Sequence, residues 1–368
     1  MESASTASPA SAQKPEIRTL ALWMLGMATM VFVIVVIGGI TRLTESGLSI
    51  TEWKPITGAI PPLNEADWVA AFEKYKRIPE YTEINGPAGM TLAGFKTIYF
   101  WEWAHRLWAR LIGYALLLPW LWFATCALLG KSGNGGLRGW LGGFRLPPGY
   151  LLRIFALGML VALQATIGWW MVSSGLLVGT DVSHFRLATH LLVALLTMAG
   201  MLWTALDLFA LTKNNNARPA RLTGYSLAIL SVLVIQLLLG AWVAGLNAGY
   251  VSNSWPLMNG RLYPEGIDWN KGGWYALTHD PFLLHFLHRW WAWIAVAALV
   301  LMARKLRAPG DRRISVAIHS AFGVQILLGI ATVMTGMNII LAVLHQAVGA
   351  LVVASAVWGA HRLGSDKA

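Results

Sequence analysis

Eight apolar runs, each long enough to cross a bilayer, are the feature that most constrains how this chain folds. They lie near residues 19–40, 108–129, 150–172, 187–211, 223–246, 282–303, 314–335 and 338–360. A hydrocarbon core of about 30 Å needs about 20 apolar residues in helical form. Hydrophobic residues make up 56% of the chain and charged residues only 12%, far fewer than in a soluble domain. We therefore predict an all-α integral membrane protein with eight transmembrane helices.

Charged residues are divided unevenly between the connections. Those after the second, fourth and sixth runs hold one acid, Asp311, and eleven basic residues: Lys131, Arg138, Arg145, Lys213, Arg218, Arg221, Arg304, Lys305, Arg307, Arg312 and Arg313. The opposite connections, at 41–104, 173–186, 247–281 and 336–340, hold nine basic and twelve acidic residues. Basic residues concentrate in cytoplasmic connections, so we expect both termini in the cytoplasm and the chain in a bacterial inner membrane. The net charge of +11 reports topology, and we expect no nucleic-acid partner.

The N-terminal segment and the cysteine content exclude several alternatives. Residues 1–18 are polar and are not rich in arginine, unlike an organelle transit peptide, so we predict a disordered cytoplasmic tail. The single cysteine, Cys126, cannot form an intramolecular disulfide or a cysteine-based metal site.

An internal repeat divides the chain into two halves, 19–211 and 223–361, each predicted to be a four-helix bundle. The matching segments are His105-Arg106-Leu-Trp-Ala-Arg with His288-Arg289-Trp-Trp-Ala-Trp, Ala-Thr-His190 with Val-Leu-His345, and Gln164-Ala-Thr-Ile-Gly168 with Gln325-Ile-Leu-Leu-Gly329. Each half therefore carries two histidines near the outer ends of its helices. The two bundles are expected to be pseudo-symmetric.

The four repeated histidines indicate metal coordination inside the membrane, because ionisable residues there are costly and are usually functional. Two imidazoles per half, with no cysteine or second carboxylate to complete a zinc site, are typical of axial haem ligation. We predict one haem per half. Arg106 and Arg289, directly after the first histidine of each pair, could bind haem propionates or anchor the helices at the interface.

The remaining histidines have weaker claims to a role in metal binding. His285 lies three residues before His288, on the same helical face, and is the rival ligand in the second half. Four others are interpreted as solvated or structural: His184, His279, His319 and His361.

One acidic position distinguishes the halves. Glu102 lies three residues before His105, whereas His285 takes the equivalent place before His288. A carboxylate beside only one haem indicates that chemistry is done there. The alternative is an ordinary glutamate of an acid-rich outer loop.

Several longer segments resemble the haem A synthases of proteobacteria and mitochondria. They are GGITRLTESGLSITEWKPITGAIPPLNEADW, WEWAHRLWARLIG, GWWMVSSGL with VSHFRLATHL, AGLNAGYVSNSWPLMNG, FLHRWWAW and LHQAVGAL. The resemblance covers about residues 20–360. Another branch of that family carries a cysteine pair in the first outer loop, which this chain lacks.

The resemblance implies an oxidoreductase that converts the C8 methyl of haem O to the formyl group of haem A by successive hydroxylations. It implies that His105 and His190 bind the substrate haem, and that His288 and His345 ligate a permanent haem B. Glu102 matches the family's functional glutamate, which we expect to stabilise developing positive charge or to accept a proton. Loop 41–104, with Arg42, Glu45, Trp53 and Trp68, would cap the first haem site or receive a partner; alternatively it is solvated, with a short amphipathic helix at 64–77.

Two other functions remain open from the residues alone. A dihaem cytochrome that only carries electrons would use the same histidines, and a transporter would use them as proton relays. We expect membrane lipid, an unidentified electron donor and haem O synthase as partners, and a homo-oligomer is compatible with the glycine-rich helices.

Overall fold

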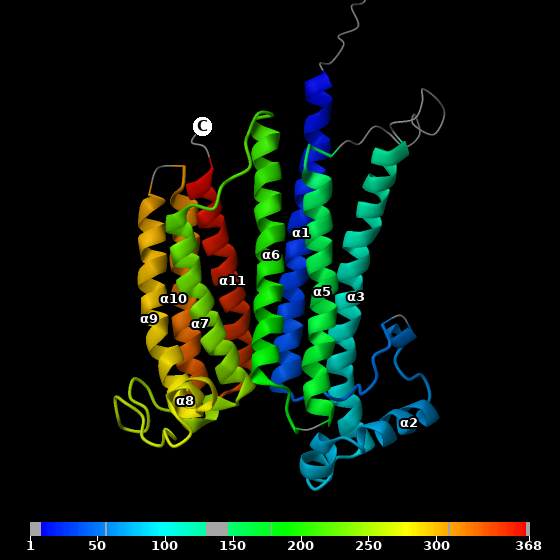
Figure 1. The fold of residues 1–368 in the computed structure, drawn as a ribbon, viewed down its shortest axis with the longest axis vertical. Coiled ribbons are helices and arrows are strands. Elements are labelled where there is room, and N and C mark those ends of the chain that lie inside the picture. The colour runs from blue at the N-terminus through cyan, green and yellow to red at the C-terminus, as the bar shows by residue number, and fades with distance from the viewer. Residues whose placement is uncertain (1–8, 56, 130–145, 178, 308–309, 366–368) are drawn as a thin grey trace, which may run out of the picture.

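The computed structural model describes residues 9–55, 57–129, 146–177, 179–307 and 310–365, and these are largely helical (Figure 1). The helical elements are α1 (Pro9–Leu43), η1 (Thr57–Ala59), α2 (Glu65–Tyr75), η2 (Glu80–Asn85), α3 (Leu92–Leu129), α5 (Tyr150–Leu177), α6 (His184–Lys213), α7 (Gly224–Gly245), η3 (Ala248–Val251), α8 (Gly273–His279), α9 (Pro281–Lys305), α10 (Arg312–Met334) and α11 (Ile339–Gly364). The short helix expected at 64–77 is α2.

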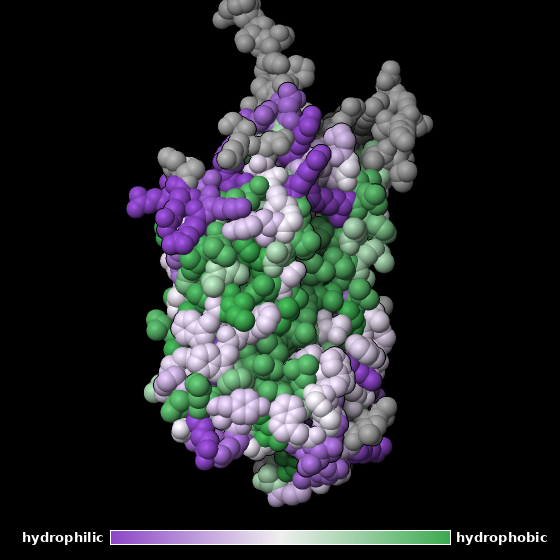
Figure 2. Space-filling view, turned by 60° about the vertical axis from the view of Figure 1, so that its left-hand side comes forward, coloured by the Kyte–Doolittle hydropathy of each residue, from purple (hydrophilic) through white to green (hydrophobic). Residues whose placement is uncertain are grey.

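Eight helices in the described part of the chain are long and apolar enough to span a membrane, which confirms the predicted number. These are α1, α3, α5, α6, α7, α9, α10 and α11. Figure 2 shows the expected surface, with an apolar band across the middle of the molecule and hydrophilic residues at its two ends. The chain is a multi-pass membrane protein.

Two predicted boundaries are wrong. α3 begins at Leu92 rather than at 108, so the first outer loop spans 44–91 instead of 41–104. The polar residues of the first turns carry their own partners, as described below, and so they do not end the helix. α1 begins at Pro9, which contradicts a disordered tail at 9–18. A helix satisfies its backbone hydrogen bonds internally and can therefore continue beyond the bilayer into water; residues 1–8 lie outside the described residues.

The long helices form two groups of four that lie side by side (Figure 1). One contains α1, α3, α5 and α6, and the other contains α7, α9, α10 and α11. The start of α1 and the end of α11 lie at the same end of the molecule, together with the α6–α7 and α9–α10 connections. Lys131, Arg138 and Arg145 lie outside the described residues, so the charge of their connection is known only from the sequence.

A tryptophan lies three residues after the first histidine of each half, and each donates a hydrogen bond to the neighbouring helix. The indole of Trp108 donates to Met30 O on α1 at 2.9 Å, and that of Trp291 donates to Val232 O on α7 at 3.0 Å. α3 also contains Pro119, which cannot donate to the carbonyl four residues earlier. Trp23 supplies that carbonyl, Ala115 O, with an indole donor at 3.1 Å.

A buried aspartate joins the two halves at the end where the termini lie. Asp207 on α6 accepts from Arg153 on α5 at 2.6 Å and pairs with His361 on α11 at 2.8 Å. It also accepts from the backbone N–H of Ala220 in the connection between the halves, at 2.9 Å. His361 is thus a structural residue of the interface between the bundles.

Topology gives the first testable prediction. Because the basic connections lie at the end that holds both termini, a green fluorescent protein fused to the C-terminus should fluoresce, whereas alkaline phosphatase inserted after Asn259 should be active. Phosphatase inserted after Asn215 is the matched control and should be inactive. Phosphatase activity of the insertion at Asn215, with no activity of the insertion at Asn259, would show that the chain has the opposite orientation in the membrane.

Candidate functional site

The four repeated histidines come together as two pairs. The rings of His105 on α3 and His190 on α6 have centroids 6.4 Å apart, with an angle of 64° between their planes. The rings of His288 on α9 and His345 on α11 have centroids 6.5 Å apart, with an angle of 86°. Each pair therefore joins two helices of one half at nearly the same separation.

The separation of the rings leaves space for one metal ion between them. Imidazole nitrogens bind first-row metals such as zinc at about 2.0–2.1 Å, and two such bonds plus the two ring radii span about 6 Å. Among the described residues, no cluster of three or more histidine, cysteine or acidic side chains could hold a metal. Each pair thus has the spacing that two ligands of one metal ion would need, and two ligands would suit a porphyrin, which carries four nitrogens of its own.

A glycine on the preceding helix of the same half lies against each histidine ring. A Cβ atom built on Gly38 or Gly168 would lie 3.2 or 3.0 Å from the ring of His105 or His190. On Gly240 and Gly329 it would lie 2.8 and 2.9 Å from the rings of His288 and His345. Contacts under 3.0 Å are essentially never made by real Cβ atoms, and contacts of 3.0–3.4 Å are tighter than most, so all four glycines constrain the ring positions.

Three glutamines, one turn before three of these glycines, contact the same histidines. Gln164 Nε2 donates to His190 O at 2.6 Å. Gln236 Nε2 lies 3.1 Å from both the carbonyl oxygen and Nδ1 of His288.

In the third case, Gln325 Nε2 lies 3.3 Å from Nε2 of His345. Ile34 takes the glutamine's place before Gly38, so the first histidine of the first half lacks this contact. Our sequence reasoning paired Gln164 with Gln325 but missed Gln236. The spacing Gln-x-x-x-Gly, which occurs at all three sites, is the signal that could have revealed it.

Arg106 connects the first histidine pair to the outer loop. Its Nε donates to Glu102 Oε1 at 2.5 Å, and its terminal nitrogens donate to the carbonyl oxygens of Ile50 and Glu52, both at 2.9 Å. These three contacts fix the guanidinium and explain why a helix can carry both charges inside a membrane-spanning segment.

Arg289 makes the same contacts in the second half, with one change of partner. Its Nε donates to His285 Nε2 at 3.0 Å, and its terminal nitrogens donate to the carbonyl oxygens of Ser252 and Ser254. The Nε2 lone pair of His285 accepts this hydrogen bond, so His285 is a partner of Arg289. The ring that faces His345 is that of His288. The sequence difference between Glu102 and His285 therefore lies at structurally equivalent positions.

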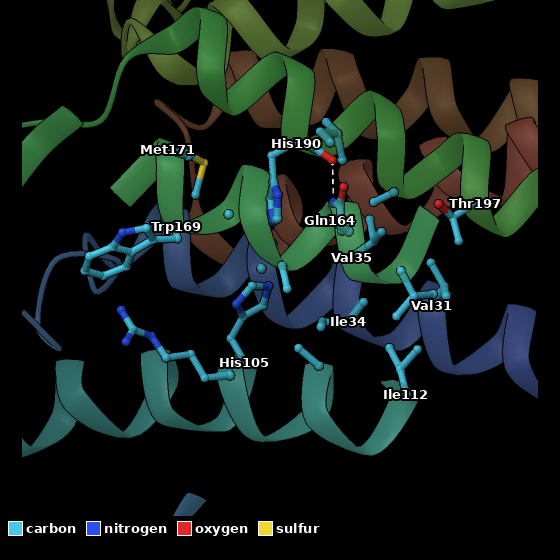
Figure 3. Close-up of a pocket in the computed structure, with 18 of the residues that line it drawn as sticks. Val31, Ile34, Val35, His105, Ile112, Gln164, Trp169, Met171, His190 and Thr197 are labelled. Carbon is cyan, nitrogen blue, oxygen red and sulfur yellow. Dashed lines mark hydrogen bonds between the residues drawn. The ribbon is translucent and has the colours of Figure 1, made fainter. Parts of the chain in front are cut away.

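A cavity of about 650 Å³ surrounds the first histidine pair between α1, α3, α5 and α6. Figure 3 shows the rings of His105 and His190 pointing toward one another, with Ile34 and Ile112 on one side and Trp169 on the other. Glu102 also lines this cavity and is only 4% exposed. A buried carboxylate thus lines the same cavity as the two rings, within a mostly apolar enclosure of the size of a ligand site.

Charged residues surround the outer end of the cavity. Arg42, Glu45, Glu80 and Asp181 all line it, and Arg42 pairs with Asp181 at 3.1 Å. Glu80 is buried and its Oε2 atom has no hydrogen-bond partner. Burial, reinforced by the charge of Glu45, raises the pKa of Glu80 to about 8. Glu80 therefore remains largely protonated at neutral pH.

Other residues singled out in the sequence lie apart from the two histidine pairs. Trp53 lines the cavity, whereas Trp68 packs against Phe95 and Tyr99 of α3. His184 is buried with its Nε2 2.9 Å from Thr278 O.

The two other histidines have local contacts. His279 stacks on Tyr275 with 4.3 Å between ring centroids, and His319 Nδ1 lies 2.8 Å from Ser315 O.

The fold and site define a class of protein: a multi-pass α-helical membrane protein in which the four repeated histidines form two facing pairs. The chain matches the cytochrome oxidase assembly protein family (COX15-CtaA) over residues 21–357. It is 55% identical over 369 residues to the haem A synthase of Sphingopyxis alaskensis, with 100% of this chain and 99% of the relative covered.

Two further relatives, also named haem A synthase, show the same full-length similarity. That of Erythrobacter litoralis is 54% identical, with 95% of this chain and 98% of the relative covered. One from Rhodopseudomonas palustris is 44% identical, with 96% and 92% covered. The chain belongs to the haem A synthase family and is an oxidoreductase of haem A biosynthesis in the bacterial inner membrane.

The glycine contacts predict a selective loss of haem. In Gly240→Ala the new methyl group would displace the ring of His288, so we expect the variant to co-purify with less haem, measured as pyridine haemochrome per chain. Gly323→Ala is the matched control, because a Cβ there meets nothing within 4 Å and alanine favours the helix. Equal haem content in the two variants would show that the ring tolerates the methyl.

The raised pKa of Glu80 predicts a pH-dependent stability. The folded chain keeps a proton that the unfolded chain releases between its ordinary pKa of 4.5 and about 8, so stability falls as pH rises through this window. Glu80→Gln should therefore melt progressively higher than wild type between pH 5 and about pH 8, by a few degrees, in thermal scans in detergent. The exposed neighbour Glu83 provides the control Glu83→Gln; a parallel pH profile for Glu80→Gln and wild type would contradict the prediction.

Proposed function

We propose that the chain oxidises the C8 methyl of haem O to a formyl group, giving haem A, by successive hydroxylations that end with loss of water. The observation that carries this proposal is the buried carboxylate of Glu102, three residues before His105, whose place before His288 is taken by His285. Family membership supports the substrate and product, since the relatives are named for haem A. The cavity around the first pair supports the assignment of the substrate to that half.

In the first half, His105 and His190 would hold the iron of the substrate from its two faces. Their glycine contacts keep the rings in position, so that binding needs little rearrangement. Glu102 uses Oε1 for the hydrogen bond from Arg106, and its Oε2 makes no hydrogen bond to any described residue. This oxygen can stabilise positive charge that builds at the edge of the macrocycle during oxidation of the methyl, or accept the proton that leaves it.

In the second half, His288 and His345 would hold haem B. When bound there, haem B supplies a one-electron redox centre close to the substrate half. The ring separation supports this role for the two histidines. His285 takes the place of the carboxylate, so the second half lacks the group that we assign to the chemistry.

The two arginines would bind haem propionates through the N–H groups that are not used in hydrogen bonds to the protein. A guanidinium has five N–H donors. Arg106 and Arg289 each use their Nε and both terminal nitrogens in the contacts described above, which leaves one N–H on each terminal nitrogen. Bidentate binding of a carboxylate by these remaining donors is compatible with the loop contacts.

The proposal is tested by replacing the carboxylate while keeping its shape. Glu102→Gln should retain both haems but accumulate haem O, with product formation lowered on the order of 100-fold, because a preorganised charge is lost. Haems extracted with acid from cells that contain haem O synthase would be separated by chromatography with mass detection. Glu52→Gln is the matched control, since its exposed side chain pairs with Lys54 and Lys74 at the surface.

The same extraction separates the proposal from its rivals. Full activity of Glu102→Gln with both haems bound would remove the carboxylate from the mechanism. Haem B alone in wild type would indicate a dihaem cytochrome that carries electrons, and the synthase activity would have to be abandoned.

A further inference from the structure

The cavity extends well past the first histidine pair toward the opposite side of the membrane. Along α3 its lining runs from His105 to Trp120, a rise of about 22 Å at 1.5 Å per residue. We define the lower arm as the part lined by residues 112–120 of α3 and 154–162 of α5. Its depth exceeds what the histidine pair needs for an iron and its macrocycle.

The lining of the lower arm is mostly apolar. Its few polar side chains are hydrogen-bonded to backbone carbonyls or are exposed. The hydroxyl of Thr197 donates to Val193 O at 2.8 Å within its own helix. The indole of Trp120 donates to Leu151 O at 3.1 Å, and Tyr114 is 49% exposed at the lipid-facing edge. An apolar ligand group therefore matches this space better than a polar one, whose hydrogen bonds would be lost.

Aromatic pairs close the seam between α3 and α5 at two levels. On the outer side, Trp53 of the loop stacks on Trp169 of α5, with centroids 5.5 Å apart and 14° between the rings. On the inner side, Trp120 of α3 packs on Phe155 of α5, with centroids 5.2 Å apart. The seam is thus covered above and below the lower arm.

Between these levels, side chains that line the lower arm are well exposed. Leu117 and Met159 line the cavity and are 49% and 53% exposed. Both belong to membrane-spanning helices.

Two glycines widen the seam at this level, and the second half lacks them. Gly113 and Gly158 line the cavity; a Cβ on Gly113 would meet nothing within 4 Å, and one on Gly158 only Leu116 at 3.9 Å. Helix packing therefore does not require glycine at either position. In the repeat, aligned on the histidines and glutamines, the equivalent residues are Val296 and His319.

We propose that the lower arm binds the prenyl tail of haem O and thereby selects the substrate over haem B. This inference rests on the proposed function, because it assigns the first half to haem O. Haem O differs from haem B in carrying a long, branched, apolar farnesyl chain on the macrocycle. The first half provides an apolar arm of matching character, whereas the half assigned to haem B has Val296 and His319 at the positions equivalent to Gly113 and Gly158.

Paired titrations with haem O and haem B test this assignment. The protein would be purified from cells without haem O synthase, and each haem would be titrated in while the Soret band is followed. Wild type should bind haem O at least about 10-fold more tightly than haem B at the first site, because the tail buries apolar surface. Gly158→Leu should weaken haem O by about 10-fold or more and leave haem B binding unchanged.

Matched variants separate a filled arm from a damaged fold. Gly323→Leu, in the equivalent helix of the second half, is the control and should bind both haems as wild type does. If Gly158→Leu loses the haem B of the second half, it is misfolded, and Gly113→Leu, which fills the arm from α3, gives the result instead. Equal affinity of wild type for the two haems, or equal weakening of both by the variants, would overturn the prenyl site alone. Failure of the first half to bind either haem would overturn the proposed function and the prenyl site together.

Discussion

The contact between a histidine ring and a glycine on the neighbouring helix is the interaction on which the rest of the structure depends. It occurs four times, once for each repeated histidine, and a methyl group at any of these glycines would crowd the ring. Close helix approach at small residues is the usual way in which membrane helices pack. Here the same approach sets the distance between the two rings of each pair at 6.4 and 6.5 Å. The same glycine contacts therefore determine how closely the helices pack and how far apart the two histidine rings lie.

The two halves share this framework and differ in what surrounds it. The tryptophan that follows each first histidine and the arginine beside it make equivalent contacts in both halves. Against this common background the differences are few: Glu102 replaces His285, Ile34 replaces a glutamine, and glycines replace Val296 and His319. In the first half, all of these residues line the cavity that contains the histidine pair. These differences fit our proposal that the first half binds the substrate and the second half a fixed cofactor.

Much of the fold was predictable from the sequence because burial in lipid imposes a simple rule on composition. All eight spans were found, since each needs a long apolar run. The start of α3 was missed because its first turns contain charges, and hydropathy does not report that Arg106 is satisfied by Glu102 and loop carbonyls. The start of α1 was missed for a related reason, since a polar helix in water leaves no hydropathy signal.

The sequence predicted those site residues that recur in the internal repeat. It did not predict those that belong to the site only through contacts between helices. Repeat positions identified the four histidines and the Glu102 difference. Gln236 was missed although its spacing to Gly240 matches that of the other two glutamines to their glycines. The burial of Glu80 at the cavity mouth had no signal in the sequence, because it depends on which segments face one another. Likewise, the sequence did not predict that Gly113 and Gly158 line a cavity between α3 and α5.

The central claim, that each half holds one haem between its two histidines, is tested most directly by the haem content of single-histidine variants. The protein would be purified from cells that make haem O, and the bound haems of His190→Ala and His345→Ala would be identified and counted per chain, with electron paramagnetic resonance reporting the axial ligation. The account predicts that His190→Ala loses the low-spin bis-histidine signal of haem O or its products and keeps that of haem B, and that His345→Ala does the reverse. Loss of the same haem from both variants, or retention of both low-spin signals in either, would contradict it.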